Sequence, residues 1–366
     1  MTEYKDISYL HMCYGLAEKA VGWASPNPYV GAVIEKKGII VGHGYHEMPG
    51  KPHAEAVALE KAGAQSKGAT AYINLEPCVH WGRTPPCIDK ILQADLKRVV
   101  ISSVDPNPLV NGKGIQRMKN AGIEVSLGLL KQRNDRLNEI YLKYIQNNIP
   151  FVTLKTALSL DGKTATKTHS SKWISSPETR KYMHLLRGEQ EAIMVGINTI
   201  LQDDPRLTVR HPSWPGKKIT RVIVDSKLRM PSTAKILSTL SKGGVIVFTL
   251  EQSISKNRKV LQKKGVKIVS LPGKGQRVDI KKVLEWLGNH KISSVLVEGG
   301  NLLQTHMLEN KLIDKIMISI SPKLVGGQGA HCFFQGAGVQ TISQSLKIKE
   351  MNEFQIGNDI VVQGYI

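Results

Sequence analysis

Two short stretches carry the strongest signal in the sequence: PHAE (Pro52–Glu55) and LEPCVHWGRTPPC (Leu75–Cys87). Together they supply an imidazole from His53 and two thiols from Cys78 and Cys87, a donor set suited to Zn²⁺. Three protein ligands leave the fourth tetrahedral position for water, and such an open position is typical of a catalytic zinc site. We therefore expect one zinc ion, held by these three residues, in the first half of the chain.

Glu55 stands two residues after His53, in the first turn of a predicted helix. From there it can take a proton from a zinc-bound water and deliver it to a leaving amine. The pattern H-x-E followed by P-C-x-x-C is typical of zinc-dependent base deaminases. This chain departs from it, because eight residues and not two separate Cys78 from Cys87. A closed, structural zinc site is the alternative, with His46 or His80 as fourth ligand, but it would leave Glu55 without a role.

Helix and strand signals alternate around these motifs. In the first half, helices are predicted for residues 6–24, 53–63, 85–94 and 113–121, and strands for residues 30–34, 39–44, 70–75, 98–103 and 123–127. Residues 131–147 have the pattern of a charged amphipathic helix that bridges two domains. A second series predicts strands at residues 151–157, 192–195, 221–224, 244–248, 266–269, 294–297 and 316–320, and a closing hairpin of residues 354–356 and 360–362. We expect an α/β fold with two domains, residues 1–148 and 149–366.

The composition limits the class of protein. A chain of 366 residues with 41% hydrophobic residues can bury two cores. It lacks an apolar run of about 18 residues, and its charged N-terminus does not resemble a signal peptide. Four cysteines are too few for a disulfide framework, so we expect a reducing, cytoplasmic location.

The formal net charge of +20 is unevenly distributed. Residues 1–148 contain 18 basic and 14 acidic side chains, a net charge of +4, whereas residues 149–366 contain 32 and 16, a net charge of +16. Such an excess favours an anionic partner, namely nucleic acid, a membrane surface or a phosphorylated small molecule. The alternative is a solvated lysine-rich surface, which we favour for the segment Lys256–Lys282.

The first half resembles a known family at its motifs. The residues His53-Ala54-Glu55, the stretch Leu75–Cys87 and the segment Asp105-Pro106-Asn107-Pro108 resemble the deaminase domain of the bifunctional riboflavin-biosynthesis deaminase–reductase. The resemblance implies a cytidine-deaminase-like α/β/α sandwich, zinc on His53, Cys78 and Cys87, and Glu55 as proton carrier. Six further residues match positions that line the substrate pocket: Asn27, His46, His80, Arg83, Asp105 and Asn107. Three of them, Asn27, Asp105 and Asn107, could instead be turn residues.

In the second half, Glu298-Gly299-Gly300-Asn301 joins a predicted strand to a predicted helix. A glycine pair at such a turn lets backbone N–H groups approach a phosphate. Many α/β proteins contain this turn without a ligand, so alone it is a weak signal. The G-x-G-x-x-G pattern is absent, which argues against a Rossmann domain.

Four segments of the second half look like the reductase half of the same family: Leu154–Lys163, Ser171–Arg180, Ile197–Arg210 and Val297–Gly300. This resemblance implies a dihydrofolate-reductase-like α/β domain that uses NADPH. The positions implied for the cofactor are Ala157, Trp173, Thr199, Asp203, Ser226, Gly300, Asn301, Leu302, Leu303, Gln304, Thr305 and His306. Those implied for the sugar phosphate are Ser171, Arg187, Leu207, Arg210 and Glu298. Arginine suits phosphate because its guanidinium binds two oxygens at once.

The resemblance implies two successive reactions of riboflavin biosynthesis. Zinc hydroxide would deaminate 2,5-diamino-6-ribosylamino-4(3H)-pyrimidinone 5′-phosphate, and NADPH would then reduce the ribosyl group of 5-amino-6-(5-phosphoribosylamino)uracil to a ribityl chain. Lys155, Asp203 and Glu298 are candidates for the general acid of the reduction.

Two rival hypotheses remain open. A polynucleotide deaminase would also explain the zinc motif and the charge, but only 5% of the residues are aromatic and no RNA-binding module is recognisable. A regulatory protein with structural zinc is the second rival. We expect small phosphorylated pyrimidines as ligands, no nucleic acid or membrane partner, and a homo-oligomer.

Overall fold

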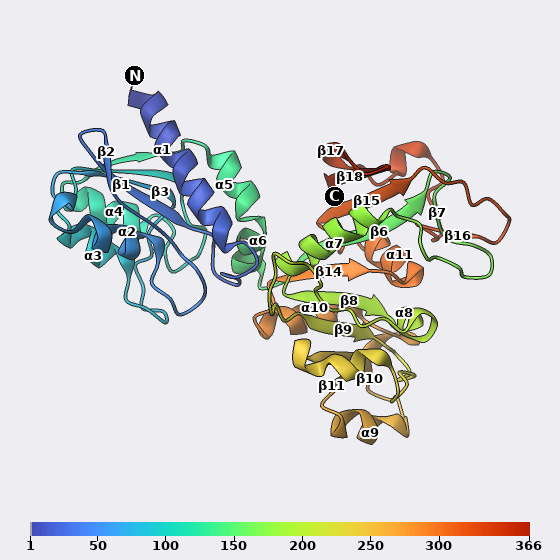
Figure 1. The fold of residues 1–366 in the computed structure, drawn as a ribbon. Helices are drawn as coiled ribbons and strands as arrows, with labels where there is room; N and C mark the ends of the chain where they lie inside the picture. The colour runs from blue at the N-terminus through green and yellow to red at the C-terminus, as the bar shows by residue number, and fades with distance from the viewer. Residues whose placement is uncertain (1) are drawn as a thin grey trace. The chain divides into compact units, whose positions relative to one another are not determined.

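The chain is described by a computed structural model that covers residues 2–366 (Figure 1). It divides into two compact units between Asn148 and Ile149. Along the described residues, no helix combines the length and the apolar character needed to cross a lipid bilayer.

The first unit contains a five-stranded mixed sheet in the order β2-β1-β3-β4-β5. Strand β1 is antiparallel to both of its neighbours, while β3, β4 and β5 run parallel. The elements in chain order are α1 (Thr2–Ala17), η1 (Glu18–Ala20), β1 (Gly31–Lys36), β2 (Ile39–Tyr45), α2 (Ala54–Ala62), η2 (Gly63–Ser66), β3 (Thr70–Leu75), α3 (Cys87–Gln93), β4 (Arg98–Ser103), α4 (Lys113–Asn120), β5 (Glu124–Leu127), α5 (Lys131–Leu137) and α6 (Glu139–Asn147).

Helices cover both faces of this sheet because its central strands are apolar on both sides. In β1, Ala32 and Ile34 enter the core that also holds side chains of α2, α3 and α4. The intervening Val33 points the other way, into a core with Leu10 and Tyr14 of α1. Alternate residues of a strand face opposite sides of a sheet, so one buried run serves two cores. The predicted α/β/α sandwich is confirmed.

Glycine brings α2 close to the sheet. A Cβ atom on Gly42 of β2 would lie 2.1 Å from the carbonyl oxygen of Ala58, in the middle of α2. Only a residue without a side chain permits this approach. Because His53 directly precedes α2, this contact also helps to fix the position of a predicted zinc ligand.

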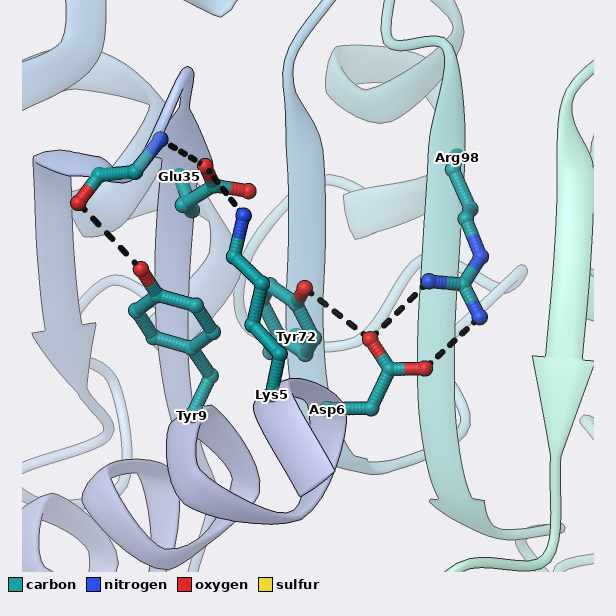
Figure 2. A network of polar contacts seen from close by, with 7 residues as sticks. Lys5, Asp6, Tyr9, Glu35, Tyr72 and Arg98 are labelled. Carbon is teal, nitrogen blue, oxygen red and sulfur yellow. Dashed lines mark hydrogen bonds and ion pairs between the residues drawn. The ribbon is translucent and has the colours of Figure 1, made fainter. Parts of the chain in front are cut away.

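Polar contacts fasten α1 to three strands (Figure 2). The Asp6 carboxylate accepts two hydrogen bonds from Arg98 of β4, of 2.9 and 2.8 Å, and a third of 3.1 Å from the Tyr72 hydroxyl of β3. Lys5 forms an ion pair of 3.0 Å with Glu35 of β1. The paired Arg98–carboxylate bonds are the strong, directional kind, so they set the position of the first turns of α1.

Two helix predictions in this unit were wrong in extent. The helix expected over residues 6–24 ends at Ala17 and continues only as the short 3-10 turn η1. Residues 131–147 form two helices, α5 and α6, that break at Asn138, where the side-chain oxygen accepts a hydrogen bond of 2.7 Å from the Tyr29 amide. They do not form a free bridge, since Tyr141 of α6 is buried in the core of the first unit.

The second unit contains a nine-stranded sheet in the order β11-β10-β9-β8-β14-β6-β15-β18-β17. The first seven strands in this order are parallel, and β18 and β17 complete the sheet in antiparallel orientation. The elements are β6 (Phe151–Ser159), β7 (Lys163–Ala165), α7 (Pro177–Glu189), β8 (Ala192–Gly196), α8 (Ile197–Asp203), β9 (Thr220–Val224), η3 (Lys235–Lys242), β10 (Val245–Leu250), α9 (Asn257–Lys263), β11 (Lys267–Leu271), β12 (Gly273–Lys274), β13 (Arg277–Val278), α10 (Ile280–Asn289), β14 (Ser294–Glu298), α11 (Asn301–Glu309), β15 (Lys315–Ser321), β16 (His331–Cys332), η4 (Ile342–Gln344), β17 (Lys349–Ile356) and β18 (Asp359–Tyr365).

This sheet also has a core on each face. In β14, Val295 and Val297 pack with α10 and α11, whereas Leu296 packs with Met183 of α7 on the opposite face. The arrangement confirms the expected α/β class of the second half. Ligands of open parallel sheets bind at the carboxyl ends of the strands. In this sheet the carboxyl ends of β6, β8, β9 and β14 lie at one edge.

Candidate active sites

The three predicted zinc ligands come together in the first unit. His53 immediately precedes α2, Cys87 is the first residue of α3, and Cys78 lies in the loop that follows β3. The Nδ1 atom of His53 lies 3.1 Å from Sγ of Cys87 and 3.5 Å from Sγ of Cys78. All three ligand atoms lie within 4.8 Å of one another.

The surroundings prepare these donors for a metal. The Cys87 amide donates a hydrogen bond of 3.3 Å to Sγ of Cys78, and the contact with the Cys87 thiol lowers the pKa of Cys78 to about 4. On the other side of the His53 ring, Nε2 lies 3.2 Å from the Thr84 hydroxyl, which leaves Nδ1 facing the sulfurs. A ligand histidine oriented through its second nitrogen is typical of zinc sites. One nitrogen and two sulfurs in this geometry fit Zn²⁺.

Glu55 is buried beside this cluster, with 4% of its surface exposed. Burial raises the pKa of its carboxyl, and the charge of His53 partly opposes that rise. A buried carboxyl in the first turn of α2 can exchange protons with a group at the cluster without competition from bulk water. This placement suits a proton carrier.

Asn27 and His46 meet on one side of the cluster. The Asn27 amide donates a hydrogen bond of 2.9 Å to Nε2 of His46, and Nδ1 of His46 donates one of 3.2 Å to the Pro52 carbonyl. The His46 ring stands edge-on to His53, with centroids 5.0 Å apart. Because both nitrogens of His46 already have partners, this residue is not placed as a fourth ligand.

The remaining predicted pocket residues divide into two groups. Asp105 is buried, accepts hydrogen bonds of 2.9 Å from the Tyr141 hydroxyl and from the Asn107 amide, and thereby closes a turn. The Asn107 side chain likewise caps the Leu109 amide. His80 is half-buried, and its Nδ1 atom has no hydrogen-bond partner among the residues described. Arg83 is exposed.

Glu76 was given no role by the sequence, although it lies inside the quoted stretch. Its buried carboxylate accepts hydrogen bonds from four backbone amides, those of Asp105, Gly112, Gly114 and Ile115, at 2.9 to 3.3 Å. It therefore holds the loop before α4 against the segment that carries Cys78. The position of a charged residue directly after a buried strand could have drawn attention to Glu76. Its role could not be predicted, because its hydrogen-bond partners lie about 30 to 40 residues away in the sequence.

A cavity of about 1140 Å³ opens at the carboxyl edge of the large sheet in the second unit. Nearly all positions predicted for the cofactor and sugar phosphate line it: Ala157, Ser171, Trp173, Arg187, Thr199, Asp203, Leu207, Arg210, Ser226, Glu298, Gly300, Asn301, Leu302, Leu303, Gln304 and His306. Thr305 is the exception. It is buried, and its hydroxyl accepts a hydrogen bond of 3.1 Å from the Gln335 amide.

Opposite charges are paired on the cavity wall. Arg187 of α7 binds both carboxylate oxygens of Glu298, at 2.9 and 2.7 Å. Burial would raise the pKa of Glu298, but the charges of Arg187 and Lys155 outweigh it and hold that pKa at about 2. Burial lowers the pKa of Lys155, against the opposing effect of Glu298. Glu298 is therefore ionised at neutral pH.

His184 is a second residue that the sequence did not single out. From α7 it contacts two cavity arginines: Nε2 lies 3.1 Å from Nη2 of Arg210, and Nδ1 lies 3.5 Å from Nη1 of Arg187. Burial and these two positive charges lower the pKa of His184 to about 4. The ring is thus neutral near pH 7 and can accept a hydrogen bond from Arg210.

The turn between β14 and α11 fits a phosphate-bearing cofactor. Gly299 and Gly300 have φ angles of +79° and +86°, which glycine adopts without strain. A Cβ atom on Gly299 would lie 3.3 Å from the hydroxyl of Thr199, and one on Gly300 would lie 3.4 Å from the Gly196 amide. Both glycines therefore keep the backbone accessible where two turns approach each other at the cavity wall.

Comparisons with known proteins match each half of the chain to a family model. Residues 3–103 match the family model of the cytidine and deoxycytidylate deaminase zinc-binding region, and residues 150–362 match that of the RibD C-terminal domain. The riboflavin biosynthesis protein RibD of Aquifex aeolicus is 43% identical, over 98% of this chain and 97% of the relative. The RibD of Escherichia coli K12 is 37% identical, over 97% and 98%.

Solved structures give the same result. Acinetobacter baumannii RibD has a TM-score of 0.89 at 36% identity and covers 100% of this chain and 99% of its own. The Thermotoga maritima diaminohydroxyphosphoribosylaminopyrimidine deaminase/5-amino-6-(5-phosphoribosylamino)uracil reductase has a TM-score of 0.87 at 33% identity, with the same coverage.

The fold and the two sites define a bifunctional enzyme with a cytidine-deaminase-like domain and a reductase domain. The chain belongs to the RibD family of riboflavin biosynthesis. It has deaminase and reductase activities, and its cofactors are zinc and NADPH.

Proposed function

We propose that residues 1–148 deaminate 2,5-diamino-6-ribosylamino-4(3H)-pyrimidinone 5′-phosphate and that residues 149–366 then reduce the ribosyl group of the product to a ribityl chain. The observation that supports this most directly is the convergence of His53, Cys78 and Cys87 within 4.8 Å beside the buried Glu55. The Thermotoga maritima relative, whose name covers both reactions, supports the substrates.

In the deamination, His53, Cys78 and Cys87 hold the zinc ion. When bound, zinc lowers the pKa of a water molecule to about 7. Glu55 takes one proton from the attacking water and passes it to the ring nitrogen. It then takes the second proton from the hydroxyl group added to the ring carbon and gives it to the amino group, which departs as ammonia. Asn27, His46, His80, Arg83, Asp105 and Asn107 are the proposed substrate contacts, with Asp105 and Asn107 acting also through the turn that they stabilise.

In the reduction, NADPH supplies a hydride for C1′ of the sugar, and Arg187 and Arg210 bind the sugar's phosphate. The residues of the glycine turn and α11 hold the cofactor, together with Ala157, Trp173, Thr199, Asp203 and Ser226. A proton must also reach the sugar nitrogen or oxygen. Glu298, with a pKa of about 2, has no proton to give at neutral pH. Lys155 and Asp203 remain as donors.

The setting of the enzyme follows from its chemistry. Free cysteines as zinc ligands favour a reducing cytoplasm, and the basic cavity favours phosphorylated pyrimidines over nucleic acid or membrane. We further propose a homo-oligomer, a hypothesis that a measurement of mass in solution can decide.

The test is to incubate the pure protein with the diaminopyrimidinone nucleotide, with and without NADPH. Ammonia should appear without NADPH, and NADPH should be oxidised once it is added. If NADPH is consumed before any ammonia appears, the proposed order of reactions is wrong.

Glu55→Gln tests the proton carrier. The variant should keep stoichiometric zinc and lose ammonia release by at least about a hundredfold, as expected for a general acid–base group. The matched control is Glu60→Gln, on the exposed side of the same helix, which should retain full activity. Zinc binding with unchanged turnover in Glu55→Gln would contradict the role and favour a structural zinc site.

A further inference from the structure

The two arginines of the proposed sugar-phosphate site are held in different ways. Arg187 of α7 donates two hydrogen bonds to the Glu298 carboxylate and one of 2.8 Å to the Thr208 carbonyl. Arg210 lies in the loop after α8 and is exposed. Among residues 2–366 its side chain has one hydrogen-bond partner, Nε2 of His184, at 3.1 Å. The orientation of the Arg210 guanidinium therefore depends on His184.

His184 lies beside the cavity but does not line it. Residues 180, 184 and 187 share one face of α7, because they are spaced four and three positions apart. The side chains of Arg180 and Arg187 line the cavity, whereas the half-buried His184 ring does not. His184 can therefore influence a phosphate in the cavity through Arg210, and not by touching the phosphate itself.

The His184 ring can serve Arg210 only as a neutral acceptor, because a neutral imidazole has one acceptor nitrogen and a protonated imidazole has none. The contact of 3.1 Å assigns the acceptor to Nε2, since Nδ1 lies 3.5 Å from a nitrogen of Arg187 that already donates elsewhere. The charged groups that act on the ring are Arg187, Arg210, Lys155 of β6 and Glu298 of β14. Three cations and one carboxylate disfavour a charged ring.

We propose that His184 is a positioning residue, which orients the Arg210 guanidinium toward the phosphate of the reductase substrate and so contributes to the preference for a phosphorylated sugar. The inference rests on the proposed function, in which Arg187 and Arg210 bind that phosphate. An exposed arginine has many rotamers, and binding must select one of them, so fixing the side chain beforehand lowers the cost of binding. The guanidinium has several N–H donors, and the contact with His184 leaves others for the phosphate oxygens.

The test measures KM and kcat of the reductase with the deaminated nucleotide and with the nucleoside that lacks the phosphate. Where turnover of the nucleoside is too slow, its inhibition constant replaces KM. His184→Leu removes the acceptor and should raise the KM for the nucleotide about 3- to 10-fold, the cost of ordering one long side chain. The kcat and the affinity for the nucleoside should stay the same, whereas a residue that only supports the fold would affect both substrates alike.

Two further variants serve as rescue and control. In His184→Gln the amide oxygen can accept the hydrogen bond in place of Nε2, so most of the affinity for the nucleotide should return. Lys181→Gln changes an exposed residue of the same helix and should behave like the unmutated protein. A Gln variant as weak as the Leu variant would contradict the role of the ring as an acceptor.

A double-mutant cycle determines whether His184 acts through Arg210. Arg210→Gln alone should raise the KM for the nucleotide more than His184→Leu does, because it removes the group that binds the phosphate. Adding His184→Leu to Arg210→Gln should then have no further effect, since residues that act through one another are not additive. Fully additive losses in the double variant would overturn the proposal.

The remaining outcomes separate the inference from the proposed function. If the unmutated enzyme does not distinguish the nucleotide from the nucleoside, the phosphate does not bind at the two arginines, and the proposed phosphate site fails together with the inference. If it distinguishes them and His184→Leu keeps its KM, or weakens both substrates equally, the inference alone is wrong. Should His184→Leu fail to fold, His184→Asn, whose shorter side chain cannot place an acceptor at the position of Nε2, should raise the KM in the same way. An unchanged KM in His184→Asn would then refute the inference.

Discussion

At the scale of single residues, the two sites differ in how far their chemistry could be predicted. The grouping of His53, Glu55, Cys78 and Cys87 was predictable because metal and proton chemistry demands particular residue types at short spacing. His184 was not, because a histidine on an amphipathic helix has no distinctive pattern and its partner Arg210 lies 26 residues further on. The contact between His184 and Arg210 forms only when folding brings α7 beside the loop after α8.

His184 gives a pH prediction. Its pKa falls from 6.5 to about 4 because its ring is half-buried and because the positive charges of Arg187 and Arg210 disfavour a further positive charge. The unfolded chain therefore binds this proton more readily, so the contribution of His184 to stability is present above pH 6.5 and is lost as pH falls toward 4. His184→Gln lacks this titration. Relative to that variant, the melting temperature of the unmutated protein should fall between pH 6.5 and 4, and parallel melting curves over this range would contradict the prediction.

At the scale of elements, strand positions were predicted well. A strand that is buried on both faces appears in the sequence as a short run of apolar residues between two turns. Strands β3 and β4 have the predicted bounds. The short strands β7, β12, β13 and β16 were missed because two or three residues carry no measurable period. The break between α5 and α6 was missed because its cause, the contact between Asn138 and Tyr29, joins residues 109 positions apart.

The packing of α2 on β2 gives a second prediction. Gly42→Ala places a methyl group 2.1 Å from the Ala58 carbonyl, so α2 must move outward. We expect a loss of roughly 1–3 kcal/mol in the free energy of unfolding of the first unit, together with weaker zinc retention, because His53 precedes α2. Urea denaturation and zinc titration with a chelator measure both effects.

Gly15→Ala is the matched control for this substitution. Gly15 lies on the exposed side of α1, and a Cβ atom added there would meet no neighbouring atom within 4 Å. Alanine at this position should be neutral or stabilising by up to about 1 kcal/mol. Equal losses in both variants would show that close packing of α2 is not the cause.

At the scale of the whole molecule, each unit has its own sheet and cores, and each site is built from residues of one unit. The order of motifs along the chain was enough to predict two α/β domains. The large cavity could not be predicted in shape, because its walls come from the ends of strands whose order in the sheet differs from their order in the sequence.

This independence gives a third prediction. Cys78→Ser should remove a zinc ligand and abolish ammonia release, while the variant still oxidises NADPH when given the deaminated nucleotide. The reason is that, within residues 2–366, the side chains that line the cavity all belong to the second unit. Assays with each substrate separately measure this, and loss of both activities would mean that the reductase depends on the zinc site.

The last hairpin of the chain has a consequence for how the protein behaves at high concentration. Strand β17 forms the outer margin of the nine-stranded sheet, and it carries exposed charges at Lys349, Glu350 and Glu353 and an irregular register between Lys349 and Asn352. Charges and irregular pairing at such a margin oppose the addition of strands from other molecules. Proteolytic loss of β17 and β18 would uncover β15, an apolar strand with regular register, and would favour fibrous self-association.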